Sequence, residues 1–129
     1  MFVGNERKIP MFKDTLLQKL QETLADHQKT VAEANQAWKD AASDFSVDLV
    51  ERVSQGDYTN MAFDLPRPTD SSKDINRAIQ MVTYSVEEVI TLDESTFNQW
   101  VLGEWSFRGR LNEIMMSASA MSGALRKKG

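Results

Sequence analysis

The sequence predicts a mainly α-helical protein with a small antiparallel β element, an α+β fold in which residues 1–129 form a single domain. Two observations predict the helices: long stretches at 12–45 and 94–126 whose apolar residues recur every three or four positions. A third predicts the β element, because two short runs at 61–65 and 86–92 have strand character. A chain of 129 residues is long enough to bury a core.

The first predicted helix spans residues 12–45 and could extend to 54, because Pro and Gly are absent until Gly56. Its apolar stripe resembles a coiled-coil seam of roughly 45 Å, which is longer than a compact domain of this size needs. We therefore expect a homo-oligomer, at least a dimer, in which copies cover each other's stripes. The expected interface residues are Leu17, Leu20, Leu24, Val31, Trp38 and Phe45.

His27 is the chain's one histidine and falls on the same stripe. It could form a pH-sensitive contact, because histidine changes charge near neutral pH. The favoured interpretation is a partly exposed histidine that is hydrogen-bonded across a pair of helices.

The middle of the chain is expected to alternate between β and α structure. MAFDL, residues 61–65, alternates apolar residues with Ala62 and Asp64, and the prolines of the loop 66–72 end it. Residues 73–83 are spaced as a short amphipathic helix capped by Ser71 or Ser72. VEEVITL, residues 86–92, is rich in β-branched residues, and we expect it to pair with 61–65.

The last predicted helix spans residues 94–126, with Asp93 as its N-cap. Trp100 and Phe107 fall on an apolar stripe that continues to Leu125, while Gly103 and Gly109 would allow a kink.

Aromatic and arginine residues are interleaved in NQWVLGEWSFRGRL, residues 98–111. Rings at helical spacing favour packing in a core or an interface. The alternative is a ligand site in which rings stack on a nucleotide base and guanidinium groups bind its phosphate. The candidate ligand-binding residues are Trp105, Phe107, Arg108 and Arg110, with Arg67 and Arg77 as further members.

The inventory for catalysis is poor. The chain has no cysteine, one histidine, no Gly-rich phosphate loop and no spaced acidic loop of the calcium-binding kind. We therefore expect no enzyme activity, no catalytic residue, no metal site and no cofactor.

Charge and hydropathy bear on partners and on location. A net charge of −4 disfavours nucleic acid and anionic membranes. No run reaches the roughly 20 apolar residues that span a bilayer, and the start lacks the apolar core of a signal peptide. We expect a cytoplasmic protein.

Two segments resemble a group of small tailed-bacteriophage proteins. Residues 64–107 are similar to the group's proline-containing loop, Asp-x-x-Arg-Ala-Ile helix, acidic strand and Phe/Trp-Val/Trp helix, and residues 24–41 are similar to its upstream helix. The matching residues are Asp74, Arg77, Ala78, Ile79, Met81, Ser85, Val86, Leu92, Phe97, Trp100, Val101 and Trp105. Ile75, Asn76 and Gly103 depart from the pattern. The resemblance implies a viral protein that works in the infected bacterial cell, and it implies no catalytic residue.

Together these observations favour a non-enzymatic, oligomeric binding protein encoded by a phage. Its expected role is anti-defence, by binding a host protein or by sequestering a signalling nucleotide. A structural or assembly accessory protein of the virion is the alternative.

Overall fold

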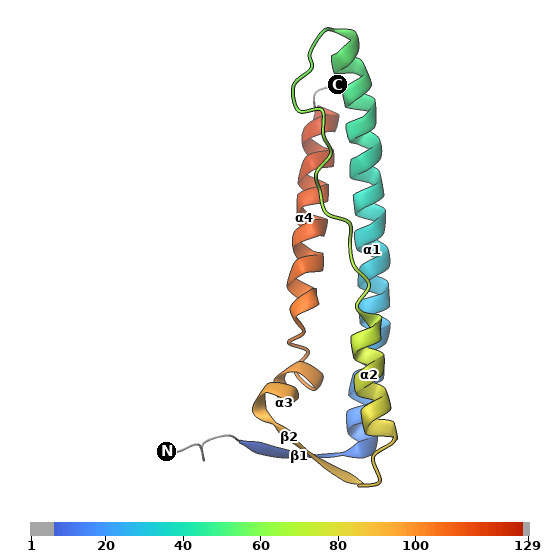
Figure 1. Ribbon diagram of the computed structural model, residues 1–129, viewed down its shortest axis with the longest axis vertical. Coiled ribbons are helices and arrows are strands. Elements are labelled where there is room, and N and C mark those ends of the chain that lie inside the picture. Colours follow the sequence, from blue (N-terminus) through green and yellow to red (C-terminus); the bar gives the residue numbers. More distant parts are fainter. Residues whose placement is uncertain (1–6, 128–129) are drawn as a thin grey trace. The chain divides into compact units, whose positions relative to one another are not determined.

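The computed structural model describes residues 7–127 and confirms the predicted fold class: the chain is mainly helical, with one two-stranded antiparallel sheet (Figure 1). The elements in chain order are β1 (Lys8–Phe12), α1 (Lys13–Ser54), α2 (Ser72–Thr83), β2 (Val89–Asp93), α3 (Glu94–Trp100) and α4 (Ser106–Lys127).

The chain divides into two compact units, whereas the sequence predicts a single domain. Unit 1 contains the chain up to Lys29 together with Asp70–Arg108, and unit 2 contains Thr30–Thr69 together with the chain from Gly109 onward. α1 contributes its first part to unit 1 and the rest to unit 2.

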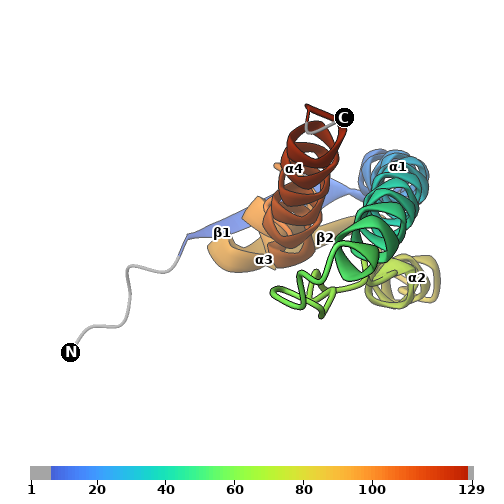
Figure 2. The ribbon, with the colours of Figure 1, turned by 90° about the horizontal axis from the view of Figure 1, so that it is seen from above.

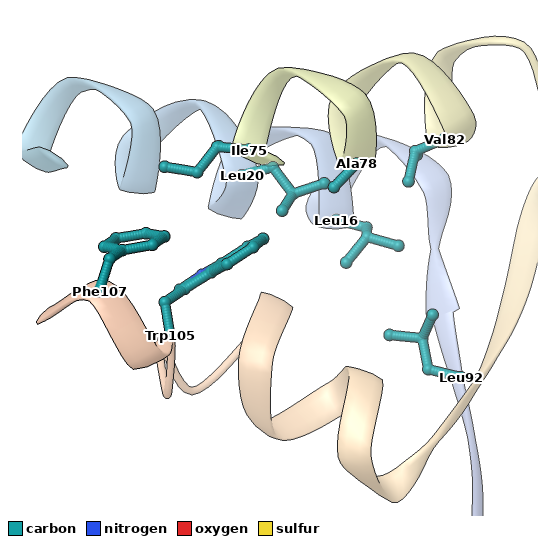
Figure 3. Packing of buried hydrophobic residues seen from close by; sticks show 8 residues of the cluster. All are labelled: Leu16, Leu20, Ile75, Ala78, Val82, Leu92, Trp105 and Phe107. Atoms are coloured by element: carbon teal, nitrogen blue, oxygen red, sulfur yellow. The ribbon is translucent and has the colours of Figure 1, made fainter. Parts of the chain in front are cut away.

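The core of unit 1 is built from segments far apart in the sequence. α2 lies along the first part of α1 (Figures 1 and 2), so the apolar face of each helix covers that of the other. Leu92 of β2 and two rings from the chain after α3 complete the core (Figure 3). Its buried members are Leu16, Leu20, Ile75, Ala78, Val82, Leu92, Trp105 and Phe107.

β1 and β2 form the sheet of unit 1, with Ile9 opposite Leu92 and Phe12 opposite Val89. The side chains alternate: Ile9, Met11 and Ile90 are half-buried toward the core, and Phe12 and Val89 are exposed. The predicted strand at 86–92 is therefore present as Val89–Asp93, shifted toward its C-terminal end. Its predicted pairing with 61–65 is wrong, because β2 pairs with Lys8–Phe12 instead. The sequence did not indicate that strand because proline is unusual inside a strand, and Pro10 lies in its middle.

Residues 61–65 have no regular secondary structure. The segment packs on α1 within unit 2: the Phe63 ring lies 5.5 Å from the Trp38 ring and 5.4 Å from the Phe45 ring, and the Trp38 indole N–H donates to the Leu65 carbonyl at 2.9 Å. The predicted strand is wrong because the alternation of Phe63 and Leu65 fits the side of a helix rather than a neighbouring strand.

The core of unit 2 is smaller. Val31 and Ala34 of α1 pack against Leu111 of α4, and Met115 lies beside them. Ala41 and Ala118 are fully buried.

The predicted single helix over 94–126 is wrong, because α3 ends at Trp100 and α4 begins at Ser106. The break is at Gly103, whose φ of +75° belongs to the left-handed region where glycine is favoured. The Val101 and Leu102 amides both donate to the Phe97 carbonyl, which closes the end of α3. Asp93 caps α3 as predicted, since its carboxylate accepts from the Thr96 amide at 2.7 Å.

α2 begins close to the predicted start but is capped differently. Ser71 makes no side-chain cap bond. The Asp70 carboxylate instead accepts from the Ser72 amide at 2.8 Å and from the Ser72 hydroxyl at 2.5 Å. Ser71 therefore occupies the N-cap position, as predicted, but the carboxylate of Asp70 makes the bond expected of its side chain, since an aspartate that bonds two residues ahead starts a turn in the same way.

Candidate interaction surface

The rings of the expected ligand site lie in the core of unit 1. Trp105 is 6% exposed and Phe107 is 3% exposed, and the two rings stack with centroids 5.4 Å apart. Both side chains point toward α1 and α2 (Figure 3). A nucleotide base could reach these rings only if the core opened, so packing, the favoured alternative, is what the structure contains.

The four arginines expected beside the rings are distributed over both units. In unit 1 the Arg108 guanidinium donates to Asp26 at 3.0 Å and to the Gly103 carbonyl at 3.1 Å, and Arg77 is exposed on α2. In unit 2 Arg67 lies over the Trp38 ring at 4.8 Å, and Arg110 is exposed on α4. Arg67 and Arg108 thus make contacts inside their own units.

The stripe expected to form an oligomer interface is largely covered within the chain. Leu20 is fully buried in unit 1, with Leu17 and Leu24 packed against the same core. In unit 2, Val31 is buried, and Trp38 and Phe45 contact Phe63. The helix does not need a second copy to cover these residues. Homo-oligomerisation remains a prediction, but the need to cover an apolar stripe no longer supports it.

His27 is a structural residue of unit 1. It is 3% exposed, and its Nε2 accepts the Ser71 backbone N–H at 2.9 Å. A ring nitrogen that accepts a hydrogen bond carries no proton, so this contact requires neutral imidazole. The Phe107 ring lies 4.3 Å from the imidazole ring, and Asp70 Oδ1 lies 3.5 Å from Nε2. Hydrogen bonds that the Ser72 hydroxyl and the Ser72 amide donate to the Asp70 carboxylate hold the pKa of Asp70 below its usual value.

The outer face of the β ribbon carries two exposed apolar side chains at one end. Phe12 is 69% exposed and Val89, its cross-strand neighbour, is 42% exposed. Sequence reasoning missed Phe12 because it placed this residue at the start of the first helix. The sequence feature that indicates this strand is the run KIPMF, in which Ile9 and Met11 stand at every second position and are half-buried.

The loop between α2 and β2 adds two exposed apolar side chains. Val86 is 97% exposed and Tyr84 is 81% exposed. Lys13 holds this loop to the ribbon, because its ammonium donates to the Ser85 carbonyl and its amide to the Glu88 carbonyl, each at 2.8 Å. We call the exposed residues Phe12, Tyr84, Val86 and Val89 the ribbon surface.

Acidic residues flank β2 at both ends. Glu87 and Glu88 precede the strand, Asp93 is its last residue, and Glu94 follows it. Glu87, Glu88 and Glu94 are exposed. The pKa of Asp93 lies below its usual value, chiefly because its carboxylate accepts from Thr96, with a smaller contribution from the charge of Lys8.

Unit 2 contains an open groove of about 580 Å³. Four carboxylates and two guanidinium groups line it, and ion pairs join Arg52 to Asp48 and Arg126 to Asp44. Its excess of negative charge would repel the phosphate of the expected nucleotide. This groove is therefore not the predicted ligand site.

Within residues 7–127, no group of three or more metal-binding side chains comes together. No helix in the same residues is both long and apolar enough to cross a bilayer.

Comparisons with protein-family models, curated proteins and solved structures gave no match for this chain.

Proposed function

We propose that this chain is a non-enzymatic binding protein that recognises a partner protein through the ribbon surface of unit 1. The observation that carries the proposal is the exposure of Phe12, Tyr84, Val86 and Val89 on backbone that Lys13 holds together. Large apolar side chains gathered at one place on a surface are typical of interaction sites. A tyrosine and a phenylalanine among them are the residue types that anchor protein interfaces.

A protein partner fits this surface better than a nucleotide. Trp105 and Phe107, the rings that would stack on a base, belong to the core, whereas exposed Phe12 lies opposite exposed Val89, and exposed Tyr84 and Val86 lie in the loop that leads to β2. Guanidinium groups, which would bind phosphate, are not among these four residues. From the resemblance to tailed-phage proteins, we further propose that the partner is a bacterial protein of the infected cell, with defence proteins as the first candidates.

The proposal is tested by crosslinking at two exposed positions. A photoreactive amino acid replaces Val86 of the ribbon surface or, as the matched control, Met116, which is 73% exposed on α4 in unit 2. We expect a specific protein from infected cells to crosslink at position 86 and not at 116. A host protein would support the inhibitor role, and a capsid or tail protein would support the alternative role in particle assembly.

The identified partner is then purified and its affinity is measured for variants. Val86→Ser and Tyr84→Ser should weaken binding by about tenfold each, as expected when an interface anchor is lost. Met116→Ser should bind like the unsubstituted protein. Equal affinities for all variants, or equal crosslinking from both positions, would show that the ribbon surface is not the binding site.

A further inference from the structure

The two outer edges of the β ribbon differ in what they can bind. In an antiparallel pair, residues that exchange hydrogen bonds alternate with residues whose backbone groups point away from the partner strand. The bond from the Lys13 amide to the Glu88 carbonyl sets this alternation, because Lys13 and Glu88 continue the register of Phe12 opposite Val89.

On β1, the backbone groups of Lys8, Pro10 and Phe12 therefore point to the outer edge. Pro10 lies in the middle of that edge and has no N–H to donate. A proline in this place prevents another strand from adding to the edge.

On β2, the backbone groups of Val89 and Thr91 point to the opposite edge. Both residues carry an N–H and a carbonyl, and among the described residues no hydrogen bond reaches these outward groups. Both side chains are also exposed. The ribbon thus has one edge that proline blocks and one edge that is free to pair.

The charges around β2 indicate which kind of strand would pair with it. Glu87 and Glu88 lie before the strand, Asp93 is its last residue and Glu94 follows it, so carboxylates lie at both ends of the free edge. Within residues 7–127, no ion pair forms to Glu87, Glu88 or Glu94. An extended segment with Lys or Arg at both ends would complement these charges.

We propose that the free edge of β2 binds an extended, basic segment of a partner protein, which adds to the ribbon as a third strand. Backbone bonds to Val89 and Thr91 supply affinity, and an apolar side chain of the segment lies beside Val89 on the exposed face, which also carries Phe12 of β1. A third strand also stabilises a ribbon that is marginal with two. This inference rests on the proposed function and specifies the chemistry of the partner.

The probe for the test is a synthetic peptide with a valine–threonine repeat between pairs of lysines, and the control peptide carries glutamates in place of the lysines. Binding is measured by calorimetry, and hydrogen exchange of the Val89 and Thr91 amides is measured by NMR. We expect the lysine peptide to slow exchange at both amides. The glutamate peptide should bind at least about tenfold more weakly, because like charges face each other.

Thr91→Pro tests the backbone contact. It removes an N–H that points away from β1 and so keeps the ribbon's own hydrogen bonds, as Pro10 does on the opposite strand. We expect this variant to lose lysine-peptide affinity by about tenfold or more. Thr91→Val, which keeps the N–H, should bind like the unsubstituted protein. Retained protection of the Met11 and Ile90 amides from hydrogen exchange would show that the ribbon is intact.

Charge-reversal variants test the same site without touching the backbone. Glu87→Lys combined with Glu88→Lys should weaken lysine-peptide binding, and Glu113→Lys on α4 should not. Failure of the peptide to slow exchange at Val89 and Thr91, or full binding by a folded Thr91→Pro variant, would overturn strand addition.

The strand-addition inference and the proposed function can fail separately. If Thr91→Pro still crosslinks its partner at position 86, strand addition is wrong and the ribbon surface remains a binding site. If the peptide binds at β2 while substitutions at Tyr84 and Val86 leave the affinity for the protein partner unchanged, the proposed function is wrong instead.

Discussion

At the scale of single residues, burial separates the side chains that hold the fold from those that are available to a partner. Trp105 and Phe107 are core residues although they stand next to Arg108 in a sequence that would suit a ligand site. Phe12 is exposed although it follows the apolar residues 9–11, and Val86 is exposed although it precedes the apolar strand β2. Which side of the backbone meets another element decides the role of each residue.

Phe107→Ala tests the core role of the rings. Removing a buried phenylalanine should lower the free energy of unfolding by about 3–5 kcal/mol, because the cavity is lined by side chains that relax only in part. Arg110→Ala, at an exposed position three residues later, should change it by less than about 0.5 kcal/mol. Chemical denaturation checks both values. A Phe107→Ala variant with an almost unchanged free energy of unfolding would contradict the core assignment.

His27→Phe tests the bond between α1 and the start of α2. A phenylalanine ring fills similar space but leaves the buried Ser71 N–H without an acceptor, which should cost about 1–3 kcal/mol. His27→Gln is the control, because its side-chain oxygen can accept in place of Nε2. The unfolding temperature of His27→Gln should be higher than that of His27→Phe. The reverse order would show that the hydrogen bond does not contribute to stability.

Asp70 and Asp93 should make the protein less stable in acid. Because the folded pKa of each lies below the ordinary value of 3.8, the stabilisation is complete above about pH 3.8 and is lost as pH falls through the folded pKa. NMR titration of the carboxyl carbons should find both pKa values below 3.8. Ser72→Ala should raise the pKa of Asp70 and leave that of Asp93 in place. If the pKa of Asp70 did not change in Ser72→Ala, the hydrogen bond from the Ser72 hydroxyl would not be the cause of its low value.

At the scale of elements, partners decide more than local pattern does. Residues 61–65 and Lys8–Phe12 both alternate, yet only the second forms a strand, because Val89–Asp93 lies opposite it in register. Phe63 takes part in a helix contact instead. The break between α3 and α4 has a more local cause, which is the left-handed backbone at Gly103.

A matched pair of glycine substitutions tests that break. Gly103→Ala should destabilise the protein by about 1–2 kcal/mol, because an L-residue is strained at positive φ. An added Cβ there would also lie 2.7 Å from an Arg108 nitrogen. Gly109→Ala lies inside α4 with open space around it and should stabilise by roughly 0.5–1 kcal/mol. Equal effects of the two substitutions would contradict the assigned backbone conformation.

At the scale of the whole molecule, the two units have cores of different size although they share α1. Unit 1 buries large side chains of α1, α2, β2 and the chain after α3, whereas unit 2 buries mainly Val31, Leu111 and alanines. Burial of apolar area is the dominant stabilising contribution to folding, so unit 1 should be the more stable.

Hydrogen exchange along α1 tests this difference inside one helix. Amides of residues 16–28 should exchange more slowly than those of residues 44–54, because local opening costs more where more apolar area is buried. Phe107→Ala should then speed amide exchange mainly in residues 16–28 of α1. Uniform protection along α1, before and after that substitution, would show that the two units open together.

The sequence alone determines α1 and α2, the α+β class, the cap at Asp93 and the glycine near the α3–α4 break, because these depend on periodicity and on the conformational preference of nearby residues. The tertiary structure decides which strand pairs with β2, that Trp105 and Phe107 are enclosed, and that Phe12, Tyr84, Val86 and Val89 are exposed. Strand pairing and burial depend on contacts between residues far apart in the chain, and no local pattern specifies those contacts.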